Sequence, residues 1–521
     1  MSKFTIKKRN RKQIKRHSKT YKRSKTNKRN KTRKLIKKGG DIMYSSTLDA
    51  EDMWREQMPR KDLICIVNKG KKVCLAFGDV SDQVKSFFYG FTRFNYAKEV
   101  IKRIGKPSAN GFIFEIENET RGYTSYSVLK SAQEPESDNL MYEYHVGLYM
   151  NKLNKLYPCF VETYGLFKYK NETQWNKFKD VPEEKNKIIN LHALQSALVP
   201  QPLDYTVGCK ESKHLAILIQ HLPKPITLDE LSDDTDFIKN ELMGALFQLY
   251  VPLAQVMNNF THYDLHLENI LLYEPVKGKY IEYHYHYMPT TFESSIHLTG
   301  TARSTKTAHM ASMKPEVFSF KSSYLLKIID YGRSYFNNTE NQVDSKQIYQ
   351  EICDTKECDY QTSNGTITCG ANFGLGWLED NSADQERTFY ISSQFKNISH
   401  DLLPLDRLYT KYEKKMKEIE TTSKGTNKAN SVIFTQEIDE LIGKVDYMDD
   451  FGTEENLKVG YPAKIFNVQD AAIFIMNCIE KPHFITHNNA VNRTKDKLGD
   501  LHIYMDGSSR PMEFIPNEIN L

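Results

Sequence analysis

HYDLHLENILL, residues 262–272, is the stretch on which the interpretation of this chain depends, because a polar segment runs directly into an apolar one. It places Asp264 and Asn269 five positions apart. Phosphoryl transfer requires a carboxylate that receives the proton of an acceptor hydroxyl, together with oxygen ligands for magnesium. A short loop before a strand can hold both groups on one side of a triphosphate. The spacing is compatible with such chemistry, although short His/Asp combinations also arise by chance on surface loops.

A second carboxylate follows 61 positions after Asn269 (330 − 269). The apolar run LLKII, residues 325–329, predicts a strand, and it ends at Asp330-Tyr331-Gly332. Glycine adopts backbone conformations that are closed to other residues, so a sharp turn is expected here. A carboxylate at such a turn suits a second magnesium ligand.

In this order, the two pieces resemble the protein kinase pattern, in which an H-R-D-x-x-x-x-N loop is followed by D-F-G and Tyr can replace Phe. The resemblance spans roughly residues 97–410. It implies an α+β, two-lobed kinase-like fold with a small, mostly antiparallel β lobe and a larger helical lobe. It also implies that Asp264 is the catalytic base and that Asn269 and Asp330 are magnesium ligands. The Asn/Lys/Tyr-rich composition, a basic arm and large insertions further resemble kinase-like proteins of giant DNA viruses.

Upstream, residues 104–113 (IGKPSANGFI) look like a variant of the kinase glycine-rich loop. Glycine there lets backbone amides approach phosphates that a Cβ would block. The segment departs from G-x-G-x-x-G by one extra residue and by Pro107 in place of a glycine, so an ordinary hairpin turn is the alternative. The resemblance implies phosphate binding by Gly105, Ser108 and Gly111.

Residues 126–131 (YSVLKS) are similar to the kinase strand whose Lys holds the α- and β-phosphates, which implies that role for Lys130. The following segment, 139–153, predicts an amphipathic helix that carries Glu143, the expected ion-pair partner of Lys130. Either residue alone is more often a solvated surface charge. The order of strand Lys, helix Glu and a further strand over 160–169 supports the kinase interpretation.

Residues 214–222 (HLAILIQHL) predict a continuous apolar strand that ends before a Pro-Lys-Pro sequence. The strand corresponds to the segment that joins the two kinase lobes, where the backbone of Gln220, His221 and Leu222 would pair with the adenine edge. A plain core strand is equally compatible with this pattern. Residues 236–260 predict one long helix that leads into the phosphotransfer loop.

Several positions depart from the protein kinase pattern. His266 stands where Ser/Thr protein kinases usually carry Lys, and this position makes its side chain a further candidate catalytic residue. H-x-D-L-H-x-x-N therefore also resembles aminoglycoside and choline kinase-like enzymes. Tyr263 replaces Arg, which removes the usual reason for activation-loop phosphorylation and predicts constitutive activity. No A-P-E signature follows Gly332. Asp401 is a candidate for the buried Asp that braces the catalytic loop in this family, and an N-cap is the alternative.

Charge divides the chain into two opposed parts. Residues 1–40 contain 19 of the 72 Lys and Arg and no acidic residue, which leaves 53 basic against 66 acidic residues and a balance of −13 elsewhere. Such a segment cannot bury enough apolar surface to offset its ordering entropy, so a disordered arm is expected. The arm can bind nucleic acid or another polyanion through counterion release. Nuclear targeting and simple solubility are equally compatible.

Cysteine usage and hydropathy indicate a compartment. The eight cysteines are scattered without a disulfide framework, as in a reducing environment. Cys353, Cys358 and Cys369 are close in sequence, but without CxxC spacing a zinc site is the weaker interpretation. No apolar run approaches the roughly 18 residues of a membrane span, and the N-terminus lacks an apolar signal region. We therefore expect a soluble, intracellular protein without a membrane partner, in the cytoplasm or nucleus of a host cell, with the virion as a further location.

These observations suggest a domain organisation. Residues 280–287 (YIEYHYHY) alternate as a strand does and put His284 and His286 on one face, where ordinary exposed histidines are favoured over a metal site. A helix is expected over 468–479 and a final hairpin around 506–509. The expected segments are the arm at 1–40, an accessory hairpin and helix at 41–96, an N-lobe at 97–222 with an insertion at 170–210, a C-lobe at 223–420 with an insertion at 276–322, and a C-terminal extension at 421–521.

The sequence as a whole predicts an ATP- and Mg²⁺-dependent phosphotransferase. A serine/threonine protein kinase acting on a protein substrate is favoured. One alternative is a small-molecule kinase of the aminoglycoside or choline kinase type. The other is a weakly catalytic pseudokinase scaffold that holds a polyanion or acidic partner through the basic arm.

Overall fold

The computed structural model divides into two units, Met1–Lys61 and Asp62–Leu521, and every element below belongs to the second. It describes four short strands between 360 and 391 and most of residues 63–181, 188–201, 213–287, 316–348, 396–411, 437–445 and 464–517. The predictions for the arm at 1–40 and for Cys353, Cys358 and Cys369 lie outside the described residues. Helices and strands are mixed, as the α+β class requires.

A nine-stranded sheet occupies the first part of this unit. Its strands are β1 (Ile66–Asn68), β2 (Lys71–Val73), β3 (Val100–Ser108), β4 (Gly111–Thr120), β5 (Tyr123–Ala132), β6 (Thr163–Tyr169), β7 (Ile188–Asn190), β8 (Leu198–Pro200) and β9 (Leu215–Gln220). Seven follow the order β7-β3-β4-β5-β9-β6-β8, and β2 joins the sheet beside β5. Arg121 and Gly122 both have positive φ between β4 and β5, as a two-residue hairpin turn requires. The apolar sequence of β9 explains its place inside the sheet, where every residue is buried.

Four helices accompany this sheet: α2 (Gly78–Phe87), α3 (Asp138–Leu153), α4 (Glu172–Lys179) and α5 (Leu191–Ala197). Helix α2 lies within the segment 41–96, for which a hairpin and a helix are expected, and the 3-10 helix η1 (Tyr89–Phe91) follows it. The segment 170–210, which the sequence left without an interpretation, supplies α4, α5 and two short strands. Strand β7 pairs with β3 and β8 pairs with β6, so this insertion extends the sheet.

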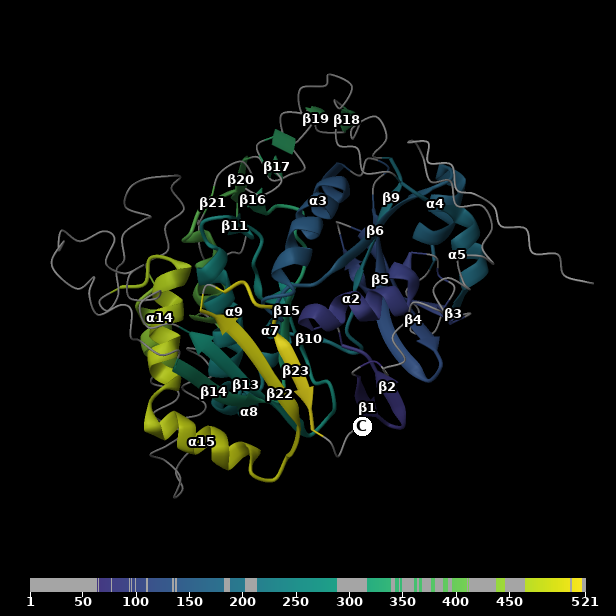
Figure 1. Ribbon diagram of the computed structural model, residues 1–521. Coiled ribbons are helices and arrows are strands. Elements are labelled where there is room, and N and C mark those ends of the chain that lie inside the picture. Colours follow the sequence, from purple (N-terminus) through teal and green to yellow (C-terminus); the bar gives the residue numbers. More distant parts are fainter. Residues whose placement is uncertain are drawn as a thin grey trace, which may run out of the picture. The chain divides into compact units, whose positions relative to one another are not determined.

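The second part is mainly helical. It contains β10 (Ile226–Thr227), α7 (Leu228–Leu231), α8 (Thr235–Asn240), α9 (Leu242–Val256), β11 (Phe260–Thr261), the 3-10 helix η3 (Leu267–Asn269), β12 (Ile270–Tyr273), β15 (Leu325–Ile328), β16 (Tyr335–Asn338), β17 (Val343–Asp344), the 3-10 helix η7 (His400–Leu402), helices at 403–409 and 437–443, α14 (Val468–Ile479) and α15 (Pro482–Asn492). Helices α9 and α14 pack against each other (Figure 1). Nearly every residue of both is buried, as their apolar sequences require.

The single long helix expected over 236–260 is wrong. Glu241 has φ −127° and separates α8 from α9. Its buried carboxylate accepts a hydrogen bond from Ser322 Oγ at 2.9 Å and lies 3.4 Å from Lys495 Nζ. These tertiary contacts hold the interruption, and local helical periodicity does not report them.

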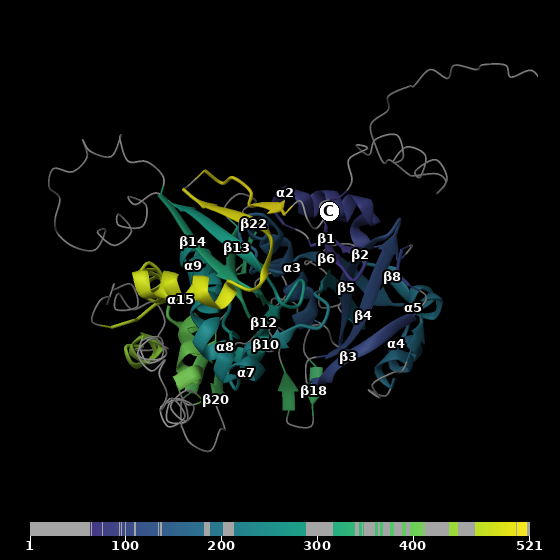
Figure 2. The ribbon, with the colours of Figure 1, turned by 90° about the horizontal axis from the view of Figure 1, so that it is seen from below.

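A four-stranded sheet joins the insertion at 276–322 to the C-terminal extension at 421–521, which were expected as separate segments. Its strands are β14 (Glu316–Ser322), β13 (Lys279–Tyr287), β22 (Asp496–Met505) and β23 (Glu513–Pro516), in that order. Strands β13 and β14 come from the insertion at 276–322, whereas β22 and β23 come from the C-terminal extension. β13 and β22 pair in parallel, and Figures 1 and 2 show the yellow C-terminal strands beside the teal insertion strands. Alternate residues Ile281, Tyr283 and Tyr285 are buried on one face, and Tyr285 contacts Phe247 of α9.

The described residues contain one disulfide, although the cysteine spacing shows no disulfide framework. A disulfide joins Cys65 to Cys74, because the β1–β2 hairpin brings their Cα atoms to 4.3 Å. Cys159 and Cys478 are free and buried. Among the residues described by the structure, no helix has both the length and the apolar character needed to cross a membrane.

Candidate active site

The loop over residues 262–269, which includes η3, connects β11 to β12 and is held by its own hydrogen bonds. The side-chain amide of Asn269 donates to the Asp264 carbonyl at 2.8 Å, and the His266 N–H donates to the same carbonyl at 2.9 Å. Tyr263 has φ +65°, a conformation that a non-glycine residue adopts only when its surroundings enforce it. The loop therefore has a defined conformation in which Asp264 is partly exposed.

Asp401 enforces that conformation from a distant part of the chain. Its carboxylate accepts the N–H of His262 at 2.8 Å and the N–H of Tyr263 at 3.1 Å. Burial raises the pKa of Asp401 to about 7, although the two N–H groups act in the opposite direction. Of the two roles left open by the sequence, the structure selects the brace on the loop.

His262 ties the loop to the segment that carries Asp330. Its Nδ1 accepts the Asp264 N–H at 3.2 Å, so the ring proton lies on Nε2, which donates to the Ile329 carbonyl at 2.9 Å. The Ile329 N–H donates to the Asn269 carbonyl at 3.1 Å. Burial lowers the pKa of His262 to about 4, so the ring is neutral near pH 7. The two motifs found in the sequence are thus joined by direct hydrogen bonds.

Lys130, Glu143 and Asp330 form a buried network that joins three elements. Lys130 on β5 lies 2.7 Å from Glu143 on α3 and 2.9 Å from Asp330, which follows β15. Burial opposes the charged form of Lys130, but the carboxylates of Asp330 and Glu143 outweigh it and raise the pKa. Burial also acts against ionisation of Asp330, yet Lys130 holds its pKa below the ordinary value. The structure therefore forms the expected Lys130–Glu143 ion pair and adds a charged Asp330 to it.

Two further residues lie around Asp264. Arg333 Nε is 3.8 Å from the Asp264 carboxylate, a loose ion pair that the sequence analysis missed. His266 is half-buried and contributes its backbone to the loop, because its carbonyl accepts the Asn269 N–H at 2.9 Å. A side-chain role for His266 remains a prediction.

The glycine-rich segment coincides with the β3–β4 hairpin. Gly105 and Ser108 lie in β3, whose pairing with β4 shifts register between Ile104 and Ser108. A Cβ on Gly111 would lie 2.3 Å from the Ser131 carbonyl of β5. The requirement for glycine at 111 therefore arises from packing between strands. Phosphate binding by this segment remains a prediction.

In residues 220–222, the segment expected to pair with adenine, two backbone N–H groups already form hydrogen bonds within the protein. The backbone N–H of Gln220 donates to the Glu162 carbonyl at 2.7 Å, and that of His221 donates to the Tyr126 carbonyl at 3.2 Å. An adenine ring would thus have to pair with the backbone carbonyls of this segment or with the Leu222 N–H. The His221 side chain lies 3.3 Å from Glu115 of β4, and this hydrogen bond lowers the pKa of Glu115.

Sequence reasoning also missed Lys327, which lies in β15 just before Asp330. Its ammonium donates to the Phe160 carbonyl at 2.8 Å and lies 3.3 Å from both Asn154 Oδ1 and Gln220 Oε1. Burial lowers the pKa of Lys327 to about 8. In the sequence, the only indication of this role was a single Lys inside an otherwise apolar strand. A Lys side chain can be buried in such a strand when polar groups accept hydrogen bonds from its ammonium.

Comparison with known proteins adds little about function. No protein-family model matches the chain. A relative, the uncharacterized protein 038R of Invertebrate iridescent virus 3, is 26% identical over 167 residues, which are 30% of this chain and 27% of that protein. A crystal structure of a Plasmodium kinase domain aligns with 47% of this chain and 54% of that one, with 12% identity and a TM-score of 0.24. A TM-score of this size does not by itself establish a shared fold.

Proposed function

We propose that the protein is an ATP- and Mg²⁺-dependent phosphotransferase with a two-lobed kinase-like fold. The observation that carries the proposal is the Lys130–Glu143–Asp330 network, in which a strand, a helix and a post-strand carboxylate meet at hydrogen-bond distance. The Asp401 brace on the loop of Asp264 supports it independently. In this proposal the nine-stranded sheet with α3 is the smaller lobe, and the α9–α14 region belongs to the larger one.

The residues present fit a magnesium nucleotide. Asp330 is held in its ionised form, and the Asn269 amide uses its N–H on the Asp264 carbonyl, which leaves its oxygen as a ligand. Lys130 would hold phosphate oxygens while Glu143 keeps it in position. Bound Mg²⁺ would neutralise phosphate charge, and ATP would supply the phosphoryl group. Asp264 would receive the proton of the acceptor hydroxyl.

We propose a serine or threonine hydroxyl of a protein as the acceptor, in a host cell infected by a virus or in the virion. The second candidate is a small-molecule hydroxyl, favoured by His266 in the sequence DLH. Phosphoproteomics of cells that make wild type or Asp264→Asn distinguishes the two. Phosphosites that depend on Asp264 support the protein kinase, whereas identical phosphosites with retained ATP turnover in the wild type point to a small molecule.

Magnesium-dependent ATP turnover of the purified chain tests the proposed activity. We expect Lys130→Met and Asp330→Ala each to lower turnover by at least about a hundredfold. Lys130→Met removes a positive charge that would balance the phosphates, and Asp330→Ala removes the carboxylate that would hold Mg²⁺. Lys71→Met is the matched control, since Lys71 pairs with Glu117 on the exposed side of the sheet. Wild-type protein that binds nucleotide without turnover would refute catalysis and favour the scaffold alternative.

A further inference from the structure

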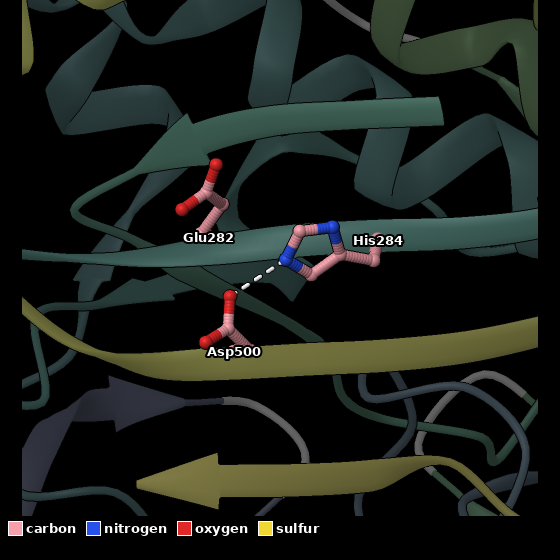
Figure 3. Close-up of side chains that lie close together, drawn as sticks. All are labelled: Glu282, His284 and Asp500. Atoms are coloured by element: carbon pink, nitrogen blue, oxygen red, sulfur yellow. Dashed lines mark hydrogen bonds and ion pairs between the residues drawn. The ribbon is translucent and has the colours of Figure 1, made fainter. Parts of the chain in front are cut away.

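Three potential metal ligands meet on the outward face of the four-stranded sheet, outside the proposed active site. Glu282 and His284 come from β13, and Asp500 comes from β22, directly opposite Glu282 in the parallel pairing. Figure 3 shows the three side chains converging. One ligand atom from each lies within 4.8 Å of the other two, a grouping of three that occurs here alone among the described residues. Carboxylate oxygens with an imidazole nitrogen form a typical donor set for zinc and related divalent ions.

Two hydrogen bonds orient the imidazole of His284. Its Nδ1 lies 2.8 Å from Ser319 Oγ on β14, and its Nε2 lies 2.7 Å from the Asp500 carboxylate. If the ring proton is on Nε2, the Ser319 hydroxyl donates to Nδ1 and both contacts are satisfied. If it is on Nδ1, the Nε2 lone pair faces a carboxylate, which is stable only with a cation between them. Ser319 can support either state, as an outer-shell partner of a metal-binding histidine does.

A cation already pairs with both carboxylates. Lys497 Nζ lies 2.6 Å from Glu282 and 2.6 Å from Asp500. The Lys497 side chain is 27% exposed, so its flexible stem can carry the ammonium into solvent without breaking a packed core. The position between Glu282 and Asp500 therefore suits positive charge, and its present occupant can leave.

We propose that Glu282, His284 and Asp500 bind one zinc-class divalent cation in exchange for the Lys497 ammonium. Tetrahedral zinc with bonds of about 2.0–2.1 Å needs ligand atoms about 3.3 Å apart, which changes of side-chain torsion can supply from the present separations. Water completes the coordination, and the Nε2 proton of His284 leaves to solvent on binding. The ion joins the insertion to the C-terminal extension by linking β13 to β22.

Zinc affinity of the chelator-treated full chain, measured by competition with a chromophoric chelator, tests this site. The buffer contains excess Mg²⁺ to exclude hard-cation sites. We expect His284→Phe, which keeps a ring stacked on His502, to weaken one bound zinc at least tenfold, and Asp500→Asn to act alike. Lys497→Met should tighten it, because the competing ammonium is gone. His286→Phe is the matched control, since His286 lies on the same strand face and pairs instead with His502.

The results that would overturn the proposal are distinct. Equal zinc affinity in wild type and His284→Phe, or loss of affinity only in His286→Phe, would refute this ligand set. Lys497→Met with weaker affinity would refute the exchange. If Asp500→Asn does not fold, the absorption spectrum of the Co²⁺-loaded wild type tests the ligand set. Nitrogen and oxygen ligands do not produce the strong thiolate absorption of cysteine ligands, so a thiolate band would refute the proposed site. Zinc should also raise the melting temperature of the wild type but not of His284→Phe.

Discussion

At the scale of single residues, Asp401 shows how a distant side chain sets the geometry of the loop. It lies 139 positions from His262 and accepts the N–H groups of both His262 and Tyr263 while fully buried. Without it, two backbone donors would lose their acceptor in the interior, and each unsatisfied group costs about 1–3 kcal/mol. The positive φ of Tyr263 would lose the contacts that impose it.

Asp401→Ala should therefore lower the free energy of unfolding by about 2–5 kcal/mol and reduce ATP turnover by more than tenfold at temperatures where the variant is folded. Chemical denaturation and a turnover assay measure the two effects. Asp229→Ala is the control, because Asp229 forms a more exposed ion pair with Lys411. A variant at 401 with wild-type turnover would show that the loop does not depend on this brace.

His400, next to Asp401, predicts a pH dependence of stability. Burial lowers the pKa of His400 to about 3, and its ring contacts Tyr263 edge to face at 4.8 Å between centroids. In the unfolded chain the ordinary pKa is about 6.5, so the unfolded state binds more protons between these values. The contribution of His400 to stability is thus complete above about pH 6.5 and is lost as the pH falls toward 3.

Relative to His400→Phe, wild type should lose about 2 kcal/mol of unfolding free energy between pH 7.5 and pH 5. Urea denaturation of both proteins at the two pH values measures this difference, and other titrating groups largely cancel. The same wild-type advantage at both pH values would mean that His400 titrates alike in the folded and unfolded chain.

At the scale of elements, the four-stranded sheet supports the helix that leads into the proposed active site. Tyr285 of β13 packs on Phe247 of α9. Strand β22 pairs with β13 on the side opposite β14. Leu501 of β22 is fully buried, whereas Ile515 of the adjacent strand β23 is 47% exposed. The C-terminal extension therefore belongs to the core of the second unit.

Leu501→Ala should lower the free energy of unfolding by about 2–5 kcal/mol, because it leaves a cavity in a buried layer. Ile515→Ala removes a similar apolar side chain from a more exposed position and should cost less than about 1.5 kcal/mol. Thermal and urea unfolding of both variants test the comparison. Equal losses would mean that β22 and β23 contribute alike to the core.

At the scale of the whole molecule, deletion of the basic residues 1–40 tests whether catalysis and polyanion binding are separate, as we propose. Deletion of these residues should leave ATP turnover unchanged and weaken binding to double-stranded DNA of arbitrary sequence by about a hundredfold at low salt. Wild-type binding should fall steeply between 50 and 200 mM salt, because Lys and Arg release counterions from the polyanion. Filter binding and turnover assays measure both. Turnover lost with the arm would contradict this division.

The sequence by itself determined the local elements and the order of the candidate residues. Helix α14 has the bounds expected for it, and α3 begins one residue before its expected start, because both have strong local patterns. The order of Lys130 and Glu143 along the chain was sufficient to expect their ion pair, which the structure forms. Asp330 joins this pair through the tertiary fold, and the catalytic roles of these residues and of Asp264 remain predictions.

Only the tertiary structure decided the contacts between distant segments. Parallel pairing of β13 with β22, the brace from Asp401 and the buried position of Lys327 join residues more than 100 positions apart. Hydrophobic periodicity describes the faces of one element and carries no information about its partner. For the same reason, the sequence could place His284 on a face with His286 but could not bring it to Asp500. The partner is chosen by packing of the whole chain.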